Sequence, residues 1–280
     1  MSTHGFHQLD VFTATPLLGN PLAVVHGADA LDAARMQAFA RWTNLSETAF
    51  LLQPTEPGAD YRVRIFTTTR ELPFAGHPTL GSCHAWLAAG GRPHGDEVVQ
   101  QCGAGLVRLR RDGERLAFAA PPLVRSGAVE PDVLAQIARS LRIAPAAIRA
   151  AQWVDNGPGW VAVLLASRAE VLALVPDYAA MQGLEIGVVA PWPGTEADEP
   201  AQFEVRAFIS TLGVPEDPVT GSLNAGLAQW LIGAGLAPAR YVASQGTVLG
   251  RAGRVHVERV GDTVWVGGHT VVCIEGEVSL

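Results

Sequence analysis

Two short stretches of this sequence place residues that can move a proton at the start of an apolar run. The first is ELPFAGHPT (71–79), which contains His77, and the second is EDPVTGSLN (216–224), which contains Asp217. An imidazole and a carboxylate suit general acid–base chemistry. A carboxylate beside an apolar helix can also have a raised pKa and hold a proton near neutral pH. We therefore take His77 and Asp217 as candidate catalytic residues.

Both stretches also have the pattern of a helix start that binds an anion. Gly76 and Gly221 would let the backbone approach a ligand closely. The first turn of a helix offers unpaired N–H groups and the positive end of its dipole, which suit a carboxylate. Plain capping is the structural alternative, because Asp217 and Ser222 are ordinary N-cap residues. The recurrence of the pattern in both halves favours a binding site that includes Gly76, Gly221 and Ser222.

Glu47 is the third candidate for proton transfer. It lies in NLSETAFLL (44–52), between an expected helix and an apolar strand. A solvated strand end is the alternative interpretation. Glu185, in GLEIGVV, takes the same place in the second half, so a glutamate could simply suit this corner.

The sequence contains an internal repeat. VRIFTTT (63–69) and VRAFIST (205–211) share valine, arginine, phenylalanine and the last threonine, and glutamate, proline and glycine recur in the stretches that follow. Within this register Leu72 faces Asp217, and His77 faces Ser222. A period this long exceeds the 20–50 residues of solenoid repeats, so the pattern predicts an ancient duplication and two similar lobes. Unlike groups at equivalent positions suit chemistry on an asymmetric substrate.

Each half is predicted to mix strands and helices. Short apolar or alternating runs indicate strands, residues 31–42 have helical spacing, and residues 78–89 form a helix that is apolar nearly all round and hence buried. The second half repeats this order, with its buried helix ending near residue 232. The Pro- and Gly-containing segment around residue 125 is predicted as the linker. We expect an N-terminal lobe of residues 1–125, joined by a returning C-terminal strand (268–280), and a C-terminal lobe of residues 126–267.

Composition excludes several classes of function. The 280 residues are 48% hydrophobic and 17% charged, with a formal net charge of −7 and no Lys/Arg-rich run, so a nucleic-acid partner is not expected. Three cysteines and eight scattered histidines predict neither a disulfide framework nor a metal site. The N-terminal segment lacks signal-peptide features, and no run is apolar enough for a membrane span. We expect a cytoplasmic protein without a metal site.

Four stretches together resemble the PhzF-like phenazine biosynthesis proteins. They are LDVFTATPLLGNPLAVV, LSETAFLL, RIFTTTRELPFAGHPTLG and GVPEDPVTGS, and the resemblance spans about residues 7–275. It implies an α+β fold of the diaminopimelate epimerase type, in which two pseudo-symmetric lobes each wrap a curved, mostly antiparallel sheet around a central helix. It also implies an active site between the lobes, a homodimer and no cofactor.

The resemblance assigns roles to individual residues. Glu47 is similar to the family's proton-transferring glutamate, and His77 and Asp217 match the histidine and aspartate that line the substrate. Ser46, Gly76, Gly221 and Ser222 match the groups that hold the substrate's carboxylate and polar edge. The sequence departs from the family at Thr68, where a proline is more usual, which should alter only the approach to the turn.

The resulting hypothesis is a cofactor-independent isomerase that moves a proton between carbons of a small cyclic or unsaturated carboxylate. Diaminopimelate epimerases carry a cysteine at each helix opening, and neither opening has one here, which argues against a two-thiol mechanism. An amino-acid epimerase and a non-catalytic metabolite- or protein-binding member of the family are the alternatives. The sequence does not specify the substrate, the stereochemistry or a part in phenazine synthesis.

Overall fold

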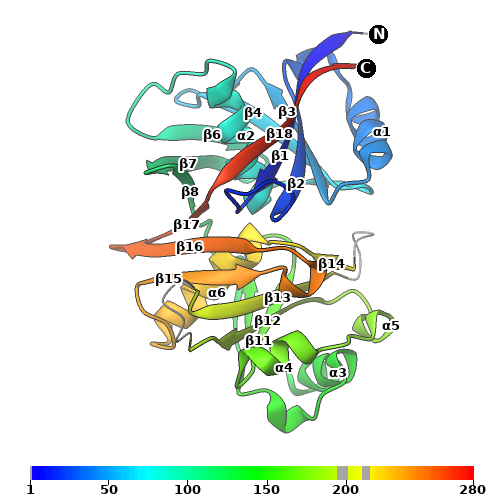
Figure 1. The fold of residues 1–280 in the computed structure, drawn as a ribbon, viewed down its shortest axis with the longest axis vertical. Helices are drawn as coiled ribbons and strands as arrows, with labels where there is room; N and C mark the ends of the chain where they lie inside the picture. The colour runs from blue at the N-terminus through cyan, green and yellow to red at the C-terminus, as the bar shows by residue number, and fades with distance from the viewer. Residues whose placement is uncertain (1, 194–200, 210–214) are drawn as a thin grey trace. The chain divides into compact units, whose positions relative to one another are not determined.

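The computed structural model describes residues 2–193, 201–209 and 215–280, so the end of the VRAFIST repeat, Ser210 and Thr211, lies outside the described residues. The chain divides into two compact units (Figure 1). Unit 1 comprises Met1–Ala119 and Gly267–Leu280, and unit 2 comprises Ala120–Val266.

Unit 1 is built on a sheet in which most neighbouring strands are antiparallel. The strands follow the spatial order β18-β1-β2-β3-β4-β6-β7-β8, and only the β2–β3 and β4–β6 pairs are parallel. The two-residue strand β5 pairs with the end of β4. Their bounds are β1 (Thr3–Val11), β2 (Asn20–Val25), β3 (Glu47–Leu52), β4 (Tyr61–Phe66), β5 (Glu71–Leu72), β6 (Val98–Cys102), β7 (Gly105–Asp112), β8 (Arg115–Ala119) and β18 (Thr270–Ser279).

Helix α2 (Gly76–Ala88) is the central helix of unit 1. It contacts β1, β2, β3, β4, β6, β8 and β18, so the sheet curves around it. Its first eight residues are all buried, as expected for a helix that is apolar on every side. The other face of the sheet is covered by η1 (Ala28–Ala30) and α1 (Ala33–Thr43), which form a cluster of buried residues with β2, β3 and β4.

Unit 2 repeats this architecture. Its strands follow the order β9-β10-β11-β12-β13-β15-β16, with parallel pairs only at β11–β12 and β13–β15, and the two-residue β14 pairs with the end of β13. Their bounds are β9 (Arg125–Gly127), β10 (Ala150–Asp155), β11 (Trp160–Leu164), β12 (Glu185–Pro191), β13 (Phe203–Ile209), β14 (Glu216–Asp217), β15 (Arg240–Gln245) and β16 (Gly253–Val260), followed by β17 (Thr263–Gly268).

Helix α6 (Gly221–Gly233) is the buried central helix of unit 2 and contacts β10, β11 and β16. A second helical layer packs on the other face of the sheet and encloses a large apolar cluster. It contains α3 (Pro131–Leu141), η2 (Pro145–Ala147), α4 (Arg168–Ala173) and α5 (Tyr178–Met181); η3 (Thr247–Leu249) follows β15. This layer is larger than its equivalent in unit 1, and the sequence repeat did not predict it.

The two units therefore have the predicted α+β fold, a mostly antiparallel sheet around a central helix in each. Their edge strands show how the repeats are connected. β9 lies near the start of unit 2, precedes β10 in the chain and pairs with it, whereas β18 follows the strands of unit 2 but pairs with β1 of unit 1. The predicted linker around residue 125 is thus a strand. All three residues of β9 are exposed, so the strand carries no apolar alternation that the sequence could show.

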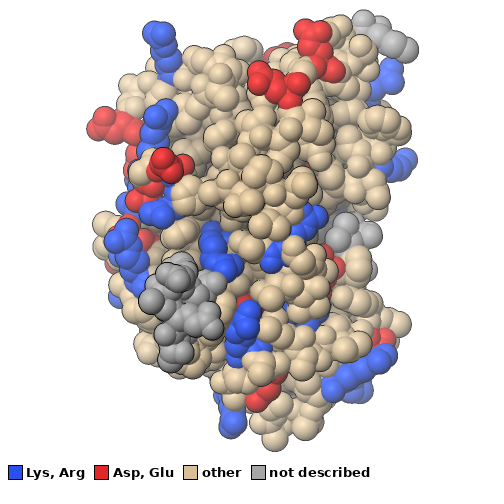
Figure 2. All heavy atoms as spheres, viewed as in Figure 1, with Lys and Arg blue, Asp and Glu red and all other residues tan. Residues whose placement is uncertain are grey.

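Surface charge of both signs is dispersed on the face shown in Figure 2. Exposed pairs such as Arg108 with Glu97 and Arg125 with Glu130 place opposite charges next to each other. Among the described residues, no helix is long and apolar enough to cross a membrane.

Candidate active site

Unit 1 brings Glu47 and His77 together. Glu47 is the first residue of β3, His77 is the second residue of α2, and the two side chains are 8% and 2% exposed. Glu47 Oε2 lies 3.5 Å from His77 Nε2. Ser46, which precedes Glu47 in the chain, is half-buried. The structure therefore places a carboxylate and an imidazole side by side at the start of a buried helix.

The environment of His77 keeps its ring neutral. Burial lowers the pKa of His77 from 6.5 to about 3, because a charged imidazolium would be cut off from water. Its Nδ1 lies 3.2 Å from Nδ2 of Asn20, the first residue of β2. The other ring nitrogen, Nε2, faces Glu47. A neutral imidazole keeps one N–H, so His77 can donate a hydrogen bond without carrying a charge.

The start of α2 also offers backbone donors. The N-cap residue Ala75 is extended and no side chain caps the helix, so the N–H groups of Gly76 and His77 have no intrahelical acceptor. Pro78 has no N–H to satisfy. Thr79 closes the turn, because its backbone N–H and its hydroxyl both donate to the carbonyl of Ala75.

In unit 2 the equivalent helix start carries Ser222 in place of the imidazole. Ser222 Oγ accepts a hydrogen bond from Trp160 Nε1 at 3.0 Å, and its carbonyl accepts one from Asn156 Nδ2 at 2.8 Å. No side chain caps α6, so the N–H groups of Gly221 and Ser222 are available in the first turn, as in α2.

Asp217 lies on β14, just ahead of α6, and is 5% exposed. Its Oδ2 accepts a hydrogen bond of 2.6 Å from the hydroxyl of Thr220. Gln245 holds this turn together, because its amide nitrogen donates to Thr220 Oγ1 and to the carbonyl of Asp217 while its amide oxygen accepts from the N–H of Thr220. The carboxylate is therefore fixed in orientation by its own turn.

The equivalence of Glu47 and Glu185 is confirmed by strand register. Glu47 pairs with Leu22 between β3 and β2, and Glu185 pairs with Trp160 between β12 and β11, at the start of the same parallel pair. Glu185 is 5% exposed. Both units therefore bury a carboxylate at this corner, and the solvated strand end considered for Glu47 is wrong.

The candidate residues fall into two groups, one in each unit. Unit 1 contains Ser46, Glu47, Gly76 and His77, and unit 2 contains Asp217, Gly221 and Ser222; the catalytic and binding roles assigned to them remain predictions. Sequence reasoning did not single out the polar partners that orient them. Thr220 lies only three residues after Asp217. The other partners are at least 25 residues away in the chain, so no local spacing indicates them; they are Asn20, Asn156, Trp160 and Gln245.

The arginine and glutamate that recur in the repeat form a pair in each unit. Arg64 makes a bidentate contact with Glu71, with two bonds of 2.7 Å. Arg206 makes the same contact with Glu216, at 2.8 and 2.7 Å. These pairs join β4 to β5 and β13 to β14, which lead into the two central helices. The recurring charges therefore hold the helix starts in place.

Within the described residues, neither the thiol of Cys83 nor a cluster of metal-binding side chains offers a second reactive site. Cys83 lies inside α2, where burial raises the pKa of its thiol to about 12 and suppresses the reactive thiolate. All 20 basic residues are arginine, so the sequence has no lysine to form a Schiff base with a cofactor. No group of three or more His, Cys, Asp or Glu side chains in the described part of the chain has the geometry to bind a metal.

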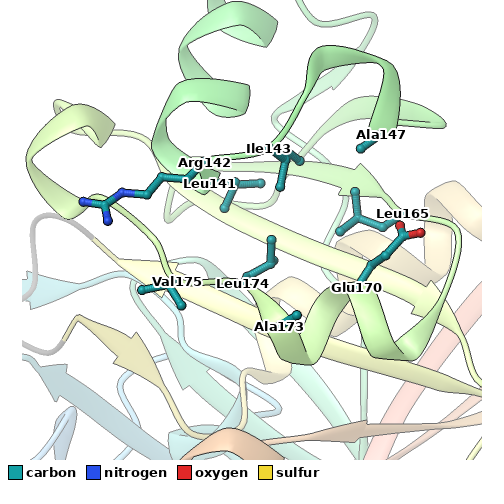
Figure 3. A pocket seen from close by; sticks show the side chains of 9 residues that line it. All are labelled: Leu141, Arg142, Ile143, Ala147, Leu165, Glu170, Ala173, Leu174 and Val175. Atoms are coloured by element: carbon teal, nitrogen blue, oxygen red, sulfur yellow. The ribbon is translucent and has the colours of Figure 1, made fainter.

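A pocket of about 310 Å³ lies elsewhere in unit 2, beside α3, η2 and α4 (Figure 3). Its wall is mostly aliphatic, Glu170 lies at one side, and the Arg142 side chain extends away from the apolar residues. None of the candidate site residues lines this pocket, so it gives no support to a role in the chemistry considered above.

Comparison with known proteins identifies the family. The sequence pattern of the phenazine biosynthesis-like proteins matches residues 9–276. The chain is 35% identical to "Antisense-enhancing sequence 1" of Schizosaccharomyces pombe, over 99% of both chains. It is 32% identical to trans-2,3-dihydro-3-hydroxyanthranilate isomerase of Pseudomonas aeruginosa, over 99% of this chain and 100% of the relative.

A comparison of structures also matches the PhzF family. The crystal structure of a PhzF-family phenazine biosynthesis protein from Enterococcus faecalis matches with a TM-score of 0.81 and 26% identity, over 100% of both chains. Together with the whole-length match of the family pattern, these similarities show that the chain is an isomerase and belongs to the PhzF-like family of phenazine biosynthesis-like proteins.

Proposed function

We propose that this chain is a cofactor-independent isomerase that moves a proton between two carbons of a small cyclic or unsaturated carboxylate. Glu47 is the base that removes the proton. The observation that carries the proposal is the pair in unit 1, a buried carboxylate 3.5 Å from a buried, neutral imidazole. A carboxylate in such surroundings has few water molecules to compete for the proton it handles.

The proposed reaction needs no external reagent. Glu47 takes a proton from carbon, and the electron pair of the C–H bond delocalises into the conjugated system that ends at the substrate's carboxylate. The Nε2–H of His77 and the N–H groups at the start of α2 donate hydrogen bonds to the oxygens on which charge develops. Glu47 then returns the proton to a second carbon, so the product is an isomer of the substrate.

The groups in unit 2 are proposed to bind and orient the substrate. Asp217 is ionisable, buried and held by Thr220, which suits it to accept a hydrogen bond from a hydroxyl or amino group. Ser222 and the N–H groups at the start of α6 are donors for a carboxylate. The P. aeruginosa relative is named for trans-2,3-dihydro-3-hydroxyanthranilate, which has these functional groups, and we propose it as the first substrate to test.

The test is exchange of substrate carbon protons in deuterated water, measured by NMR together with turnover. Wild-type protein should isomerise the compound and incorporate deuterium at carbon. Glu47→Gln keeps the size and hydrogen-bonding capacity of the side chain but cannot take a proton, so it should lose at least about 10²-fold in rate, the lower range for general base catalysis. Its affinity for 3-hydroxyanthranilate, an aromatic analogue, should stay near that of the wild type.

A matched control shows whether the loss is specific. Glu114→Gln removes an exposed carboxylate from the same unit and should leave exchange unchanged. Full exchange in Glu47→Gln would contradict the role of Glu47. Binding without any exchange by the wild type would contradict trans-2,3-dihydro-3-hydroxyanthranilate as the substrate.

Two-thiol amino-acid epimerisation finds no support in the site. The three cysteines are Cys83 within α2, Cys102 at the end of β6 and Cys273 in β18, and none lies in the first turn of α2 or α6. If the protein caused D- or L-amino acids to lose optical rotation, the measurement would support that alternative.

A further inference from the structure

The second residue of each central helix receives a hydrogen bond from an equivalent place in its own unit. In unit 1 the donor is Asn20, the first residue of β2, and the acceptor is His77. In unit 2 the donor is Trp160, the first residue of β11, and the acceptor is Ser222. All four side chains are buried. The residue types differ completely between the units, yet the direction of the hydrogen bond is the same.

In unit 1 this contact determines which nitrogen of His77 carries the proton. A neutral imidazole has one donor and one acceptor nitrogen. Because Asn20 Nδ2 donates to Nδ1, the proton is on Nε2. The other side of the ring agrees, since Nε2 lies 3.5 Å from Glu47 Oε2 and an unprotonated Nε2 would place two lone pairs against each other.

In unit 2 the contact determines the direction in which the hydroxyl of Ser222 points. An indole N–H can only donate, so Ser222 Oγ acts as acceptor towards Trp160. The hydroxyl proton must then point away from Trp160, towards another acceptor. Trp160 is 2% exposed and its ring is packed in the unit, so its N–H has a fixed position.

We propose that Asn20 and Trp160 are positioning residues, which make His77 and Ser222 hydrogen-bond donors for the oxygens of the substrate. The inference rests on the proposed function and narrows its substrate class, because both helix starts then offer donors and select a molecule with acceptor oxygens in more than one place. A carboxylate together with a hydroxyl, or with the oxygen of a developing enolate, meets this requirement. A single amine or ammonium group does not.

The tautomer of His77 tests the first half without any substrate. Long-range ¹H–¹⁵N NMR distinguishes the two neutral tautomers, and His77→Gln identifies the signals. We expect an Nε2–H ring in the wild type at neutral pH. Asn20→Asp replaces the donor with an acceptor and should move the proton to Nδ1, whereas Asn20→Leu should give a mixture. Nδ1–H in the wild type would overturn the proposal, and the wild-type spectrum decides this even where a variant fails to fold.

The indole signal of Trp160 tests the second half, with Trp160→Phe to identify it. Ser222→Ala should shift the indole proton to higher field because its acceptor is lost, and Ser222→Thr, which keeps a hydroxyl, should leave it near its wild-type position. If the chemical shift of the indole proton stayed unchanged in Ser222→Ala, the assignment of Trp160 as the donor to Ser222 would be overturned.

Kinetics then show whether these contacts act on the substrate. Trp160→Phe removes the donor and keeps a smaller aromatic ring. We expect KM for trans-2,3-dihydro-3-hydroxyanthranilate to rise about fivefold, the effect of one hydrogen bond. The same change in a Ser222→Ala background should have no further effect, since Trp160 acts through Ser222. Additive losses would contradict the positioning role. If the NMR results hold and the wild type shows no turnover, the proposed function fails and the hydrogen-bond directions stand.

Discussion

His77 differs from an ordinary catalytic histidine because it does not titrate near neutral pH. Burial lowers its pKa from 6.5 to about 3, so the ring stays a neutral donor as the pH falls through 6.5. We expect kcat/KM to show no ionisation near 6.5 that belongs to His77. The pH–rate profiles of wild type and His77→Gln test this. A step near 6.5 that is present in the wild type and absent in the variant would show that His77 works as a conventional base.

The two arginine–glutamate pairs differ in burial, and we expect this difference to decide how much each contributes to the free energy of unfolding. Arg206 and Glu216 are 4% and 6% exposed, and Arg206 also donates to the carbonyls of Val171 and Leu174. Arg206→Met leaves a buried charge without its partner, and we expect the free energy of unfolding to fall by about 3–5 kcal/mol.

Arg64→Met is the matched control for the same contact in unit 1. Glu71 there is 41% exposed, so the remaining carboxylate keeps contact with water and the loss should be within about 1 kcal/mol. Urea denaturation of both variants measures the difference. Equal losses would mean that the contact acts through geometry and not through burial.

At the level of elements, one glycine in each central helix sets how closely that helix packs on the sheet. A Cβ on Gly226 would lie 2.2 Å from the backbone oxygen of Val154 in β10, which cannot move without shifting the strand. We expect Gly226→Ala to lower the free energy of unfolding by about 1–3 kcal/mol, the usual cost of overpacking. Gly81→Ala should cost less, because it meets the flexible side chain of Leu22.

Gly233→Ala in the same helix is the control. A Cβ there meets nothing within 4 Å, so the better helix propensity of alanine should leave stability unchanged or slightly raised. Thermal denaturation of the three alanine variants gives the order. A Gly226→Ala protein as stable as the wild type would mean that α6 can move away from β10 at no cost.

The elements that could be predicted from sequence are those with an apolar pattern. The repeat and the all-round apolar runs located α2 and α6, and the alternation in residues 61–66 located β4. β9 could not be found in this way, because its three residues are exposed on both faces and read as a loop. Helix α3 was missed for another reason, since the first half has no equivalent and the interpretation relied on the repeat.

In the candidate site too, the residues that could be predicted are those with a local sequence pattern around them. Glu47, His77 and Asp217 are visible in the sequence because local motifs surround them. Thr220, which donates to Asp217, lies in the same local motif. Asn20 and Trp160 are tens of residues from His77 and Ser222, and only the fold brings these pairs together. An Arg–Glu repeat is visible in the sequence, but whether such a pair is buried, as Arg206 is, depends on the helices that cover it.

For the whole molecule, the return of β18 means that residues 1–119 do not form unit 1 by themselves, whereas unit 2 is one continuous segment, Ala120–Val266. β18 pairs with β1 along nine positions, so residues 1–119 alone would expose the edge of β1. The two ends of unit 1 lie side by side, because Ser2 and Leu280 exchange backbone hydrogen bonds of 2.7 and 2.9 Å (Figure 1).

This arrangement allows unit 1 to be made as one continuous chain. A two-residue Asn-Gly turn fits a pair of residues that exchange both hydrogen bonds, so residues 267–280, Asn-Gly and residues 2–119 should form a hairpin of β18 and β1. We expect this permuted chain to unfold cooperatively in urea with dispersed amide NMR signals, and the fragment 1–119 to be less stable and to aggregate. A scrambled 267–280 segment on the same turn is the control for added length. If the fragment 1–119 were as stable as the permuted chain, the pairing of β18 with β1 would contribute nothing to unit 1, and the return of β18 would be a matter of connectivity alone.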